Sequence, residues 1–316
     1  MTAPETPDNP AKPFPAWQEK SRRAVSRLRR YWQEIPHALR HRQGVSHPSG
    51  TLPFTPPEQV VEATLAASWL GHASVLIRIG NQWVLTDPVF SHRIGIPVGP
   101  LTIGLGRLSP PPDPSRLPRP DVILLSHAHF DHLDKPTLRR FAGPHTRVIT
   151  AAGTGGLVPR GFAQVDELKW NQNLSLGDVQ LRAMQPRHWG ARTAIDSHRG
   201  YNSYVIDASD RRVLFAGDTA MSDCFAPLAR ESKPIDLAIF GIGAYDPWIH
   251  NHASPEQAWE MFRQSGGRRM MPMHHSTFKL SDEPREEPLQ RLLRIAGERV
   301  DQLVGLELGS TWLDAQ

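Results

Sequence analysis

The sequence has little cysteine and no long apolar run, and each shortage excludes a class of protein. Its 316 residues include one cysteine, Cys224, so no framework of disulfides within the chain can hold the fold. A lone thiol also suits a reducing compartment. No stretch approaches the ~18 consecutive apolar residues of a membrane-spanning helix. The first residues have neither a basic start nor an apolar run, so we expect no signal peptide and a cytoplasmic protein.

Positive charge is concentrated near the N-terminal end. Residues 1–50 hold nine Lys or Arg and four acidic residues, an excess of five, whereas the whole chain carries +4. Apolar residues at helical spacing, with arginines between them, predict a helix over residues 17–34. This helix could make a peripheral contact with an anionic membrane, or it could pack on the rest of the protein, which we favour. Nucleic acid is not an expected partner, because no recognition module accompanies the arginines.

Three histidines and an aspartate stand within six residues, directly after an apolar run. Residues 122–125 predict a short buried strand, so His127, His129, Asp131 and His132 lie on the loop that leaves its C-terminal end. Zinc binds imidazole nitrogens and carboxylate oxygens. In an extended His-x-His segment both side chains point the same way, and the residues after the turn can face a second metal ~3.5–4 Å away. The anchored position favours a metal site over a surface cluster.

Three further candidate ligands follow predicted strands far along the chain. His188 comes soon after a predicted strand over 179–184, and Asp218 comes directly after one over 213–216. His274 stands at the end of another apolar stretch. Strand ends of a layered α/β protein meet at one edge, so we expect these residues to join the histidine run in one site.

The ordered set His-x-His-x-Asp-His, then His, Asp and His, resembles the metallo-β-lactamase superfamily. Further segments resemble the N-acyl-phosphatidylethanolamine phospholipase D family within it: residues 69–74, 85–91, 215–219, 242–247, 252–258 and 274–278. The resemblance covers roughly residues 65–313. It implies an α/β (α+β) protein, an αββα sandwich of two mixed β-sheets flanked by helices. We expect an N-terminal extension over residues 1–62 and a catalytic domain over 63–316.

The pattern along the catalytic domain agrees with such a sandwich. Apolar runs predict strands at 67–70, 75–79, 83–86, 122–125, 147–150, 179–184, 203–206, 213–216 and 237–241. Helices are predicted at 136–141, 254–264 and 287–295. Ser254 is a good N-cap, with Pro255 at the first helical position. Residues 91–120 are rich in Gly and Pro and predict a long loop near the site.

The resemblance implies a role for each candidate ligand. It assigns one zinc to His127, His129 and His188, a second zinc to Asp131, His132 and His274, and a bridging position, shared with a hydroxide, to Asp218. Two zinc ions are therefore expected, and Mn²⁺ or Fe²⁺ could take their place. Two metals lower the pKa of a shared water toward ~7, so no protein nucleophile is needed.

Several neighbouring residues have more than one interpretation. His252 could protonate the leaving alkoxide, or it could be an ordinary loop residue. Of the adjacent pair His274 and His275, the resemblance favours His274 as the ligand, because the family's ligand precedes a large residue and then small-Thr-Phe. Asp87 is expected to hydrogen-bond the ligand loop. His72 is expected to be a structural hydrogen-bonding histidine beside the site.

The function that the resemblance implies is a zinc-dependent phosphodiesterase of phospholipase D type, acting on N-acyl-phosphatidylethanolamine-like phospholipids. The alternative is a hydrolase of the same fold acting on another small substrate, such as a sugar-phosphate lactone or a small phosphodiester. Arg187 stands where the family carries Gln, which leaves the headgroup open. Arg187 or Arg192 could bind a phosphate or form a structural ion pair. The complete ligand set argues against a binding protein without activity, and the lack of an RNA-binding module argues against a nuclease.

Overall fold

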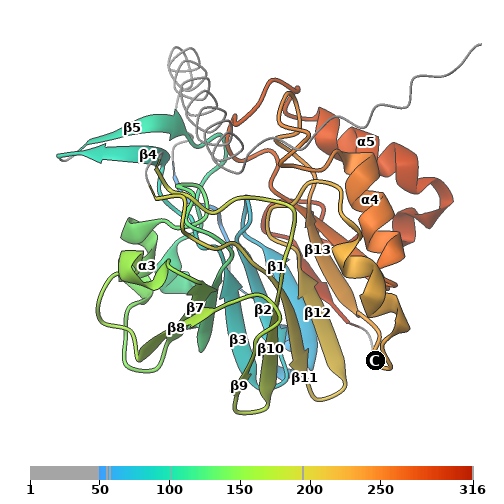
Figure 1. Ribbon diagram of the computed structural model, residues 1–316, viewed down its shortest axis with the longest axis horizontal. Coiled ribbons are helices and arrows are strands. Elements are labelled where there is room, and N and C mark those ends of the chain that lie inside the picture. The colour runs from blue at the N-terminus through green and yellow to red at the C-terminus, as the bar shows by residue number, and fades with distance from the viewer. Residues whose placement is uncertain (1–49, 55, 57, 100, 194–195, 315–316) are drawn as a thin grey trace, which may run out of the picture.

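Two β-sheets lie face to face at the centre of the molecule (Figure 1). The computed structural model describes residues 50–314 except 55, 57, 100 and 194–195. The first sheet is mixed, with strand order β15-β1-β2-β3-β6-β7-β8. Its strands are β15 Thr311–Leu313, β1 Leu65–Trp69, β2 Val75–Ile79, β3 Gln82–Thr86, β6 Val122–Leu125, β7 Arg147–Ala151 and β8 Gln164–Leu168.

The second sheet is also mixed, with strand order β14-β13-β12-β11-β10-β9. Its strands are β14 Arg269–Met273, β13 Leu237–Gly241, β12 Arg211–Phe215, β11 Ser203–Ala208, β10 Val179–Met184 and β9 Asn173–Leu176. Strands β12, β13 and β14 run parallel to one another, as do β3, β6, β7 and β8 in the first sheet. The C-terminal ends of each parallel set therefore lie together at one edge of its sheet. Strand β10 runs in the same direction as β12, because β11 lies antiparallel to both, so the candidate ligands all follow strand ends on this side of the sheets.

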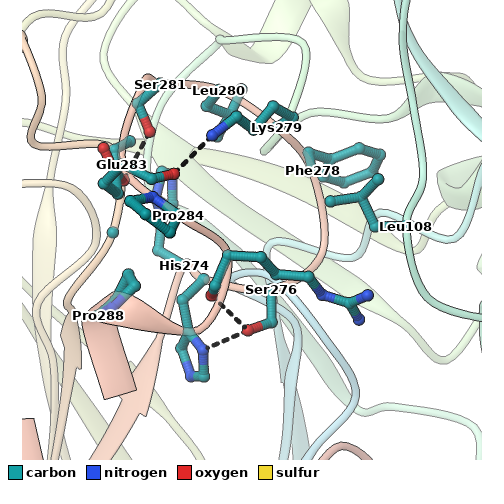
Figure 2. Close-up of a pocket in the computed structure, with 14 residues that line it drawn as sticks. Leu108, His274, Ser276, Phe278, Lys279, Leu280, Ser281, Glu283, Pro284 and Pro288 are labelled. Carbon is teal, nitrogen blue, oxygen red and sulfur yellow. Dashed lines mark hydrogen bonds between the residues drawn. The ribbon is translucent and has the colours of Figure 1, made fainter. Parts of the chain in front are cut away.

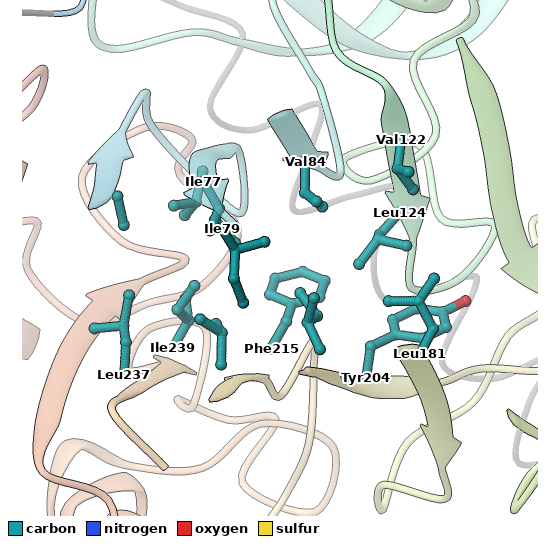
Figure 3. Packing of buried hydrophobic residues seen from close by; sticks show 14 of the residues in the cluster. Ile77, Ile79, Val84, Val122, Leu124, Leu181, Tyr204, Phe215, Leu237 and Ile239 are labelled. Atoms are coloured by element: carbon teal, nitrogen blue, oxygen red, sulfur yellow. The ribbon is translucent and has the colours of Figure 1, made fainter. Parts of the chain in front are cut away.

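The main core fills the space between the sheets. Figure 3 shows Ile77, Val84 and Leu124 of the first sheet facing Phe215 and Ile239 of the second. All of these side chains are fully buried. Burial of apolar area is the main favourable term in folding, at about 25 cal/mol per Å². The interior faces thus fix the distance between the two sheets and, with it, the positions of the loops at their ends.

Helices cover the outer face of each sheet. Leu138 and Phe141 of α3 (Lys135–Phe141) pack on the first sheet. The second sheet is covered by the 3-10 helix η3 (Asp223–Arg230) and by α4 (Pro255–Gln264) and α5 (Glu287–Ala296), whose apolar sides share one cluster with β13. The layer order is therefore helix, sheet, sheet, helix, which confirms the predicted αββα fold.

Short segments with an apolar or alternating pattern form strands close to where the sequence predicts them. The strands predicted at 122–125, 179–184 and 237–241 have the same bounds in the structure. The predicted cap of α4 is also confirmed: the Ser254 hydroxyl accepts the Gln257 N–H, and the Gln257 side chain accepts the Ser254 N–H. Strands β8 and β9 were missed. Both are largely exposed edge elements with polar residues, so their sequences carry no apolar run.

The prediction of one long loop over residues 91–120 is wrong. Strands β4 (Arg93–Val98) and β5 (Leu101–Gly106) form a two-stranded antiparallel hairpin that projects from the body (Figure 1). Glycine normally weakens a strand, and here Gly95 lies directly opposite Gly104. Ile and Leu flank these two glycines, so the hairpin has an apolar strand pattern on one face only.

The described part of the N-terminal region contacts the catalytic body. Phe54 is buried in the cluster that contains Leu138 and Phe141, and Leu52 pairs with Pro112. A short helix, α2 (Gln59–Glu62), precedes β1. The helix predicted over residues 17–34 lies outside the described residues. Among the residues that are described, no helix has the length and apolar character needed to cross a membrane.

Candidate metal centre

The residues that the sequence singles out come together at one end of the sandwich. One group contains His127, His129, His188 and Asp218, and a second contains Asp131, His132 and His274 together with His72. Within each group, one nitrogen or oxygen of every member lies within 4.8 Å of those of the others. All seven predicted ligands are in these two groups, from loops that follow β6, β10, β12 and β14.

One oxygen of Asp218 lies between the two groups. Asp218 Oδ2 is 3.8 Å from His127 Nε2 and 3.7 Å from His188 Nε2, both of the first group. The same atom is 3.1 Å from His132 Nε2 and 3.2 Å from His274 Nε2, both of the second. This is the position expected of a carboxylate shared by two cations.

Hydrogen bonds on the outer side of three histidines fix which nitrogen faces the centre. His132 Nδ1 donates to Asp87 Oδ2 at 2.7 Å, and His188 Nδ1 donates to the Asn251 carbonyl at 3.0 Å. His127 Nδ1 lies 2.8 Å from the Ser126 hydroxyl. With the proton held on Nδ1, each Nε2 presents its lone pair to the centre, as metal-ligating histidines do.

Asp87 is the residue that braces the ligand loop. Its carboxylate accepts the Ser126 N–H at 2.7 Å and the Ser126 hydroxyl at 2.5 Å, in addition to His132. Asp87 itself is fully buried at the end of β3. The predicted hydrogen bonding of Asp87 to the ligand loop is therefore confirmed.

Buried polar atoms at the centre test whether metal ions fit there. Within the described part of the chain, both carboxylate oxygens of Asp218 and the Nε2 atoms of His132 and His274 have no hydrogen-bond partner. A buried polar atom left without a partner costs about 1–3 kcal/mol, and more when it is charged. Imidazole nitrogens and carboxylate oxygens in this number suit Zn²⁺ and similar divalent ions. The residues present therefore fit a pair of cations.

The charge state of the histidines agrees with that interpretation. Burial lowers the pKa of His129 to about 3 and that of His188 to about 4, so both are neutral at pH 7. Burial acts the same way on His274, but the Asp218 and Asp131 carboxylates outweigh it and raise the pKa of His274 to about 9. Two buried carboxylates thus attract positive charge to this place, and a metal ion would compete with the proton for it.

The structure separates the two adjacent histidines that follow β14. His274 Nε2 faces the carboxylates, 3.5 Å from Asp131 Oδ2 as well as 3.2 Å from Asp218. His275 turns the other way and stacks on Trp69 with ring centroids 4.6 Å apart. Of the pair, His274 alone is among the grouped residues, in keeping with the prediction.

His72 is closer to the centre than the sequence reveals. Its Nε2 lies 3.1 Å from Asp131 Oδ2, and its ring centroid lies 4.1 Å from that of His274. Its backbone has φ +53°, which a non-glycine residue seldom adopts. The expectation of a hydrogen-bonding histidine beside the site is confirmed. Its partner Asp131 could not be named, because the two are 59 residues apart in the chain.

Arg192 holds the ligand loop by its backbone. Its guanidinium donates to the carbonyls of Ala128 and Leu133 at 2.8 and 2.9 Å and lies 4.0 Å over the Phe130 ring. The Arg192 guanidinium therefore holds both ends of the segment that carries His129, Asp131 and His132. Neither predicted use of Arg192, a phosphate or an ion pair, corresponds to these contacts. The side chain of Arg187 is exposed.

His252 also reaches the centre. Its Nδ1 is 3.7 Å from Asp218 Oδ2, and its ring lies 5.2 Å from His274 and 5.1 Å from His188 between ring centroids. The side chain is 17% exposed, so it can exchange protons with solvent. Ala253 N donates to the Thr219 carbonyl at 2.8 Å, which ties the loop of His252 to the loop of Asp218.

A small pocket is lined by His274 and His275 and by residues of the loops that follow β13 and β14 (Figure 2). Its volume is about 20 Å³, enough for a water molecule. Buried Glu283 accepts the N–H groups of Ala244 and Asp246 and the hydroxyl of Ser281. Glu283 thereby joins the loop after β13 to the loop after β14 and fixes the backbone that presents His274.

Comparison with known proteins agrees with this geometry. The family described as Beta-lactamase superfamily domain matches residues 82–275 of the chain. The chain belongs to the β-lactamase superfamily. It is a metal-dependent hydrolase of the metallo-β-lactamase fold, with the His and Asp cluster at the end of the sandwich where the strands deliver it.

Similar proteins in this superfamily cover most of the chain. An uncharacterized protein of Mycobacterium tuberculosis is 31% identical over 294 residues, which is 86% of this chain and 78% of that protein. The N-acyl-phosphatidylethanolamine-hydrolyzing phospholipase D 1 of Caenorhabditis elegans is 29% identical over 274 residues, 79% of this chain and 76% of that protein. The solved structure of CmlA, a diiron β-hydroxylase from Streptomyces venezuelae, has a TM-score of 0.58 at 22% identity and covers 79% of this chain and 54% of its own.

Proposed function

We propose that the chain hydrolyses a phosphodiester bond of a phospholipid, in the manner of a phospholipase D, with N-acyl-phosphatidylethanolamine as the model substrate. The observation that carries the proposal is the pair of ligand groups that share Asp218. Two-metal sites of this kind stabilise both the attacking and the leaving oxygen of an in-line displacement at phosphorus. The similarity to the C. elegans phospholipase supports a phospholipid as the substrate.

The chain's own residues would hold two Zn²⁺ ions. His127, His129 and His188 would take one, Asp131, His132 and His274 the other, and Asp218 would take part in both. When bound, such ions activate a water molecule and neutralise charge on the phosphoryl group. Mn²⁺ or Fe²⁺ could replace zinc, and CmlA, which shares the fold, is a diiron protein.

The remaining residues of the centre would orient the ligands and move protons. Asp87 and Arg192 hold the ligand loop from opposite sides through the contacts described above. His252 would give a proton to the departing alcohol oxygen, because it borders Asp218 and is partly open to solvent. Asp131 and Asp218 would keep the ligand histidines in place and balance the charge of the ions.

A second candidate substrate class is a small phosphodiester or a sugar-phosphate lactone. It is favoured by Arg187, which is exposed one residue before His188 and can meet an anionic group of a compact substrate. We further propose a cytoplasmic protein in which the basic segment over residues 1–50 can make a peripheral contact with anionic membrane, as the alternative to the packing on the body that the sequence favours.

A substrate panel distinguishes these functions. The metal-loaded protein is incubated with N-acyl-phosphatidylethanolamine, bis(p-nitrophenyl) phosphate, cyclic nucleotides and lactones. We expect phosphatidic acid from the phospholipid and slow hydrolysis of bis(p-nitrophenyl) phosphate. Turnover of lactones with none of the phosphodiesters would overturn the proposed function in favour of another reaction on the same fold. Protein with Asp218→Asn is the control for contaminating hydrolases.

A further inference from the structure

The β4–β5 hairpin has one apolar face that runs outward from the metal centre. Ile94 pairs with Leu105 and Ile96 pairs with Ile103 across the hairpin. Directly paired residues point to the same side of a ribbon, as do residues two apart along a strand. Ile94, Ile96, Ile103 and Leu105 therefore share one face, and Val98 continues it toward the tip.

The inner end of this face packs against the ligand loop. Ile94 is 6% exposed and lies in a cluster with Val89 and Phe278, against which Leu105 and Phe130 also pack. Phe130 stands between His129 and Asp131 in the chain. The apolar face thus begins at a side chain of the segment that carries the candidate ligands.

The outer end of the same face is open to solvent. Ile96 is 42% exposed, Val98 is 51% exposed and Ile103 is 46% exposed. These side chains are among the most exposed large apolar residues in the described part of the chain. Leaving apolar side chains in water is unfavourable, so such a patch is a sign of an interaction surface.

The opposite face of the hairpin is built differently. Gly95 lies opposite Gly104, and Pro97 lies opposite Thr102. A Cβ at Gly95 would come within 2.2 Å of the Ile103 carbonyl oxygen, and one at Gly104 within 2.1 Å of the Ile94 carbonyl oxygen. No side chain can therefore be added at either glycine without moving the backbone, and only one face of the ribbon is apolar.

We propose that this face enters the apolar layer of a lipid membrane and guides a phospholipid from the bilayer to the metal centre. The inference rests on the proposed function, since a phospholipid substrate is presented in a bilayer. No residue from 94 to 106 is charged, so this segment can enter the hydrocarbon layer without moving a charge out of water. Three half-exposed side chains fall well short of the ~800 Å² per partner of a stable protein interface, so a second copy fits poorly.

Neighbouring residues on opposite faces of β5 provide the test. Ile103→Asp places a charge on the apolar face, and Thr102→Asp places the same charge on the other face as the matched control. Binding of the full chain to phosphatidylcholine vesicles is measured by co-sedimentation in ~1 M salt, where the Debye length is about 3 Å and attraction by basic residues is screened. We expect Ile103→Asp to weaken vesicle binding at least about tenfold, because a charge in hydrocarbon is costly, and Thr102→Asp to change it less than about threefold.

Two further measurements separate the possible outcomes. Hydrolysis of bis(p-nitrophenyl) phosphate should be the same in both variants and the parent, and it reports on the proposed function independently of lipid. Ile96→Ser, a milder change on the same face, should also reduce vesicle binding and guards against misfolding of Ile103→Asp. Equal vesicle binding by all forms would overturn the proposal. A concentration-dependent dimer in gel filtration that Ile103→Asp dissolves would overturn it in favour of a second copy.

Discussion

At the scale of single residues, the centre is defined by which atom of each side chain faces inward. Asp218 Oδ2 approaches four histidines of two groups, and outer hydrogen bonds from Nδ1 turn the Nε2 atoms of His127, His132 and His188 toward it. Among the described residues, both oxygens of Asp218 and the Nε2 atoms of His132 and His274 have no hydrogen-bond partner, which is why the residues fit cations rather than a network of hydrogen bonds.

The pair His274 and His275 gives a direct test at this scale. His274→Ala should release about one equivalent of metal and reduce hydrolysis of bis(p-nitrophenyl) phosphate by more than ~100-fold, beyond the 10–100-fold typical of losing an outer partner. His275→Ala removes the stack on Trp69 and the 3.0 Å contact of His275 Nδ1 with the Ser276 hydroxyl, and it should retain activity within about tenfold. Metal content is read by mass spectrometry. The reverse ranking of the two variants would place the ligand one residue later.

At the scale of elements, strand ends and helix starts bring the site residues together. The sequence predicted the strands well where an apolar run marks a buried strand, as in β6 and β13, or where apolar residues alternate, as in β10. It failed at the β4–β5 hairpin, because glycine on one face hid the strand pattern of the other. The contacts of His72 with Asp131 and of Arg192 with Ala128 were also beyond prediction, since they join segments 59 and 64 residues apart.

The N-cap of α4 should contribute measurably to stability. Ser254 and Gln257 form a reciprocal capping box that begins two residues after His252. Ser254→Ala should lower the free energy of unfolding by about 1 kcal/mol, because an N–H of the first turn loses its partner. Urea denaturation followed by fluorescence measures the change. Ser222→Ala is the control, since that cap makes one bond of 3.3 Å to a 3-10 helix and should cost less. Equal losses would mean that the box adds nothing.

At the scale of the whole molecule, the charge is divided unevenly between the basic residues 1–50 and a nearly neutral remainder. Deletion of residues 1–49 keeps Leu52, which pairs with Pro112, and Phe54, which is buried in the apolar cluster on the first sheet. The truncated chain should hydrolyse bis(p-nitrophenyl) phosphate as the parent does. If the basic segment contacts membrane, the truncated chain should bind anionic vesicles more weakly at low salt, because attraction worth about 1 kcal/mol per basic residue near the surface is lost. Unchanged binding in a sedimentation assay would instead favour a basic segment that packs on the body.

The measurement that tests the central claim most directly is the fate of solvent oxygen. The metal-loaded chain is incubated with N-acyl-phosphatidylethanolamine in ¹⁸O-labelled water, and the products are analysed by mass spectrometry. Attack at phosphorus by an activated water molecule predicts one ¹⁸O in phosphatidic acid and none in the released N-acylethanolamine. The Asp218→Asn protein should give neither product. Label in a fatty acid or in the alcohol, or no hydrolysis by the metal-loaded parent, would contradict the account.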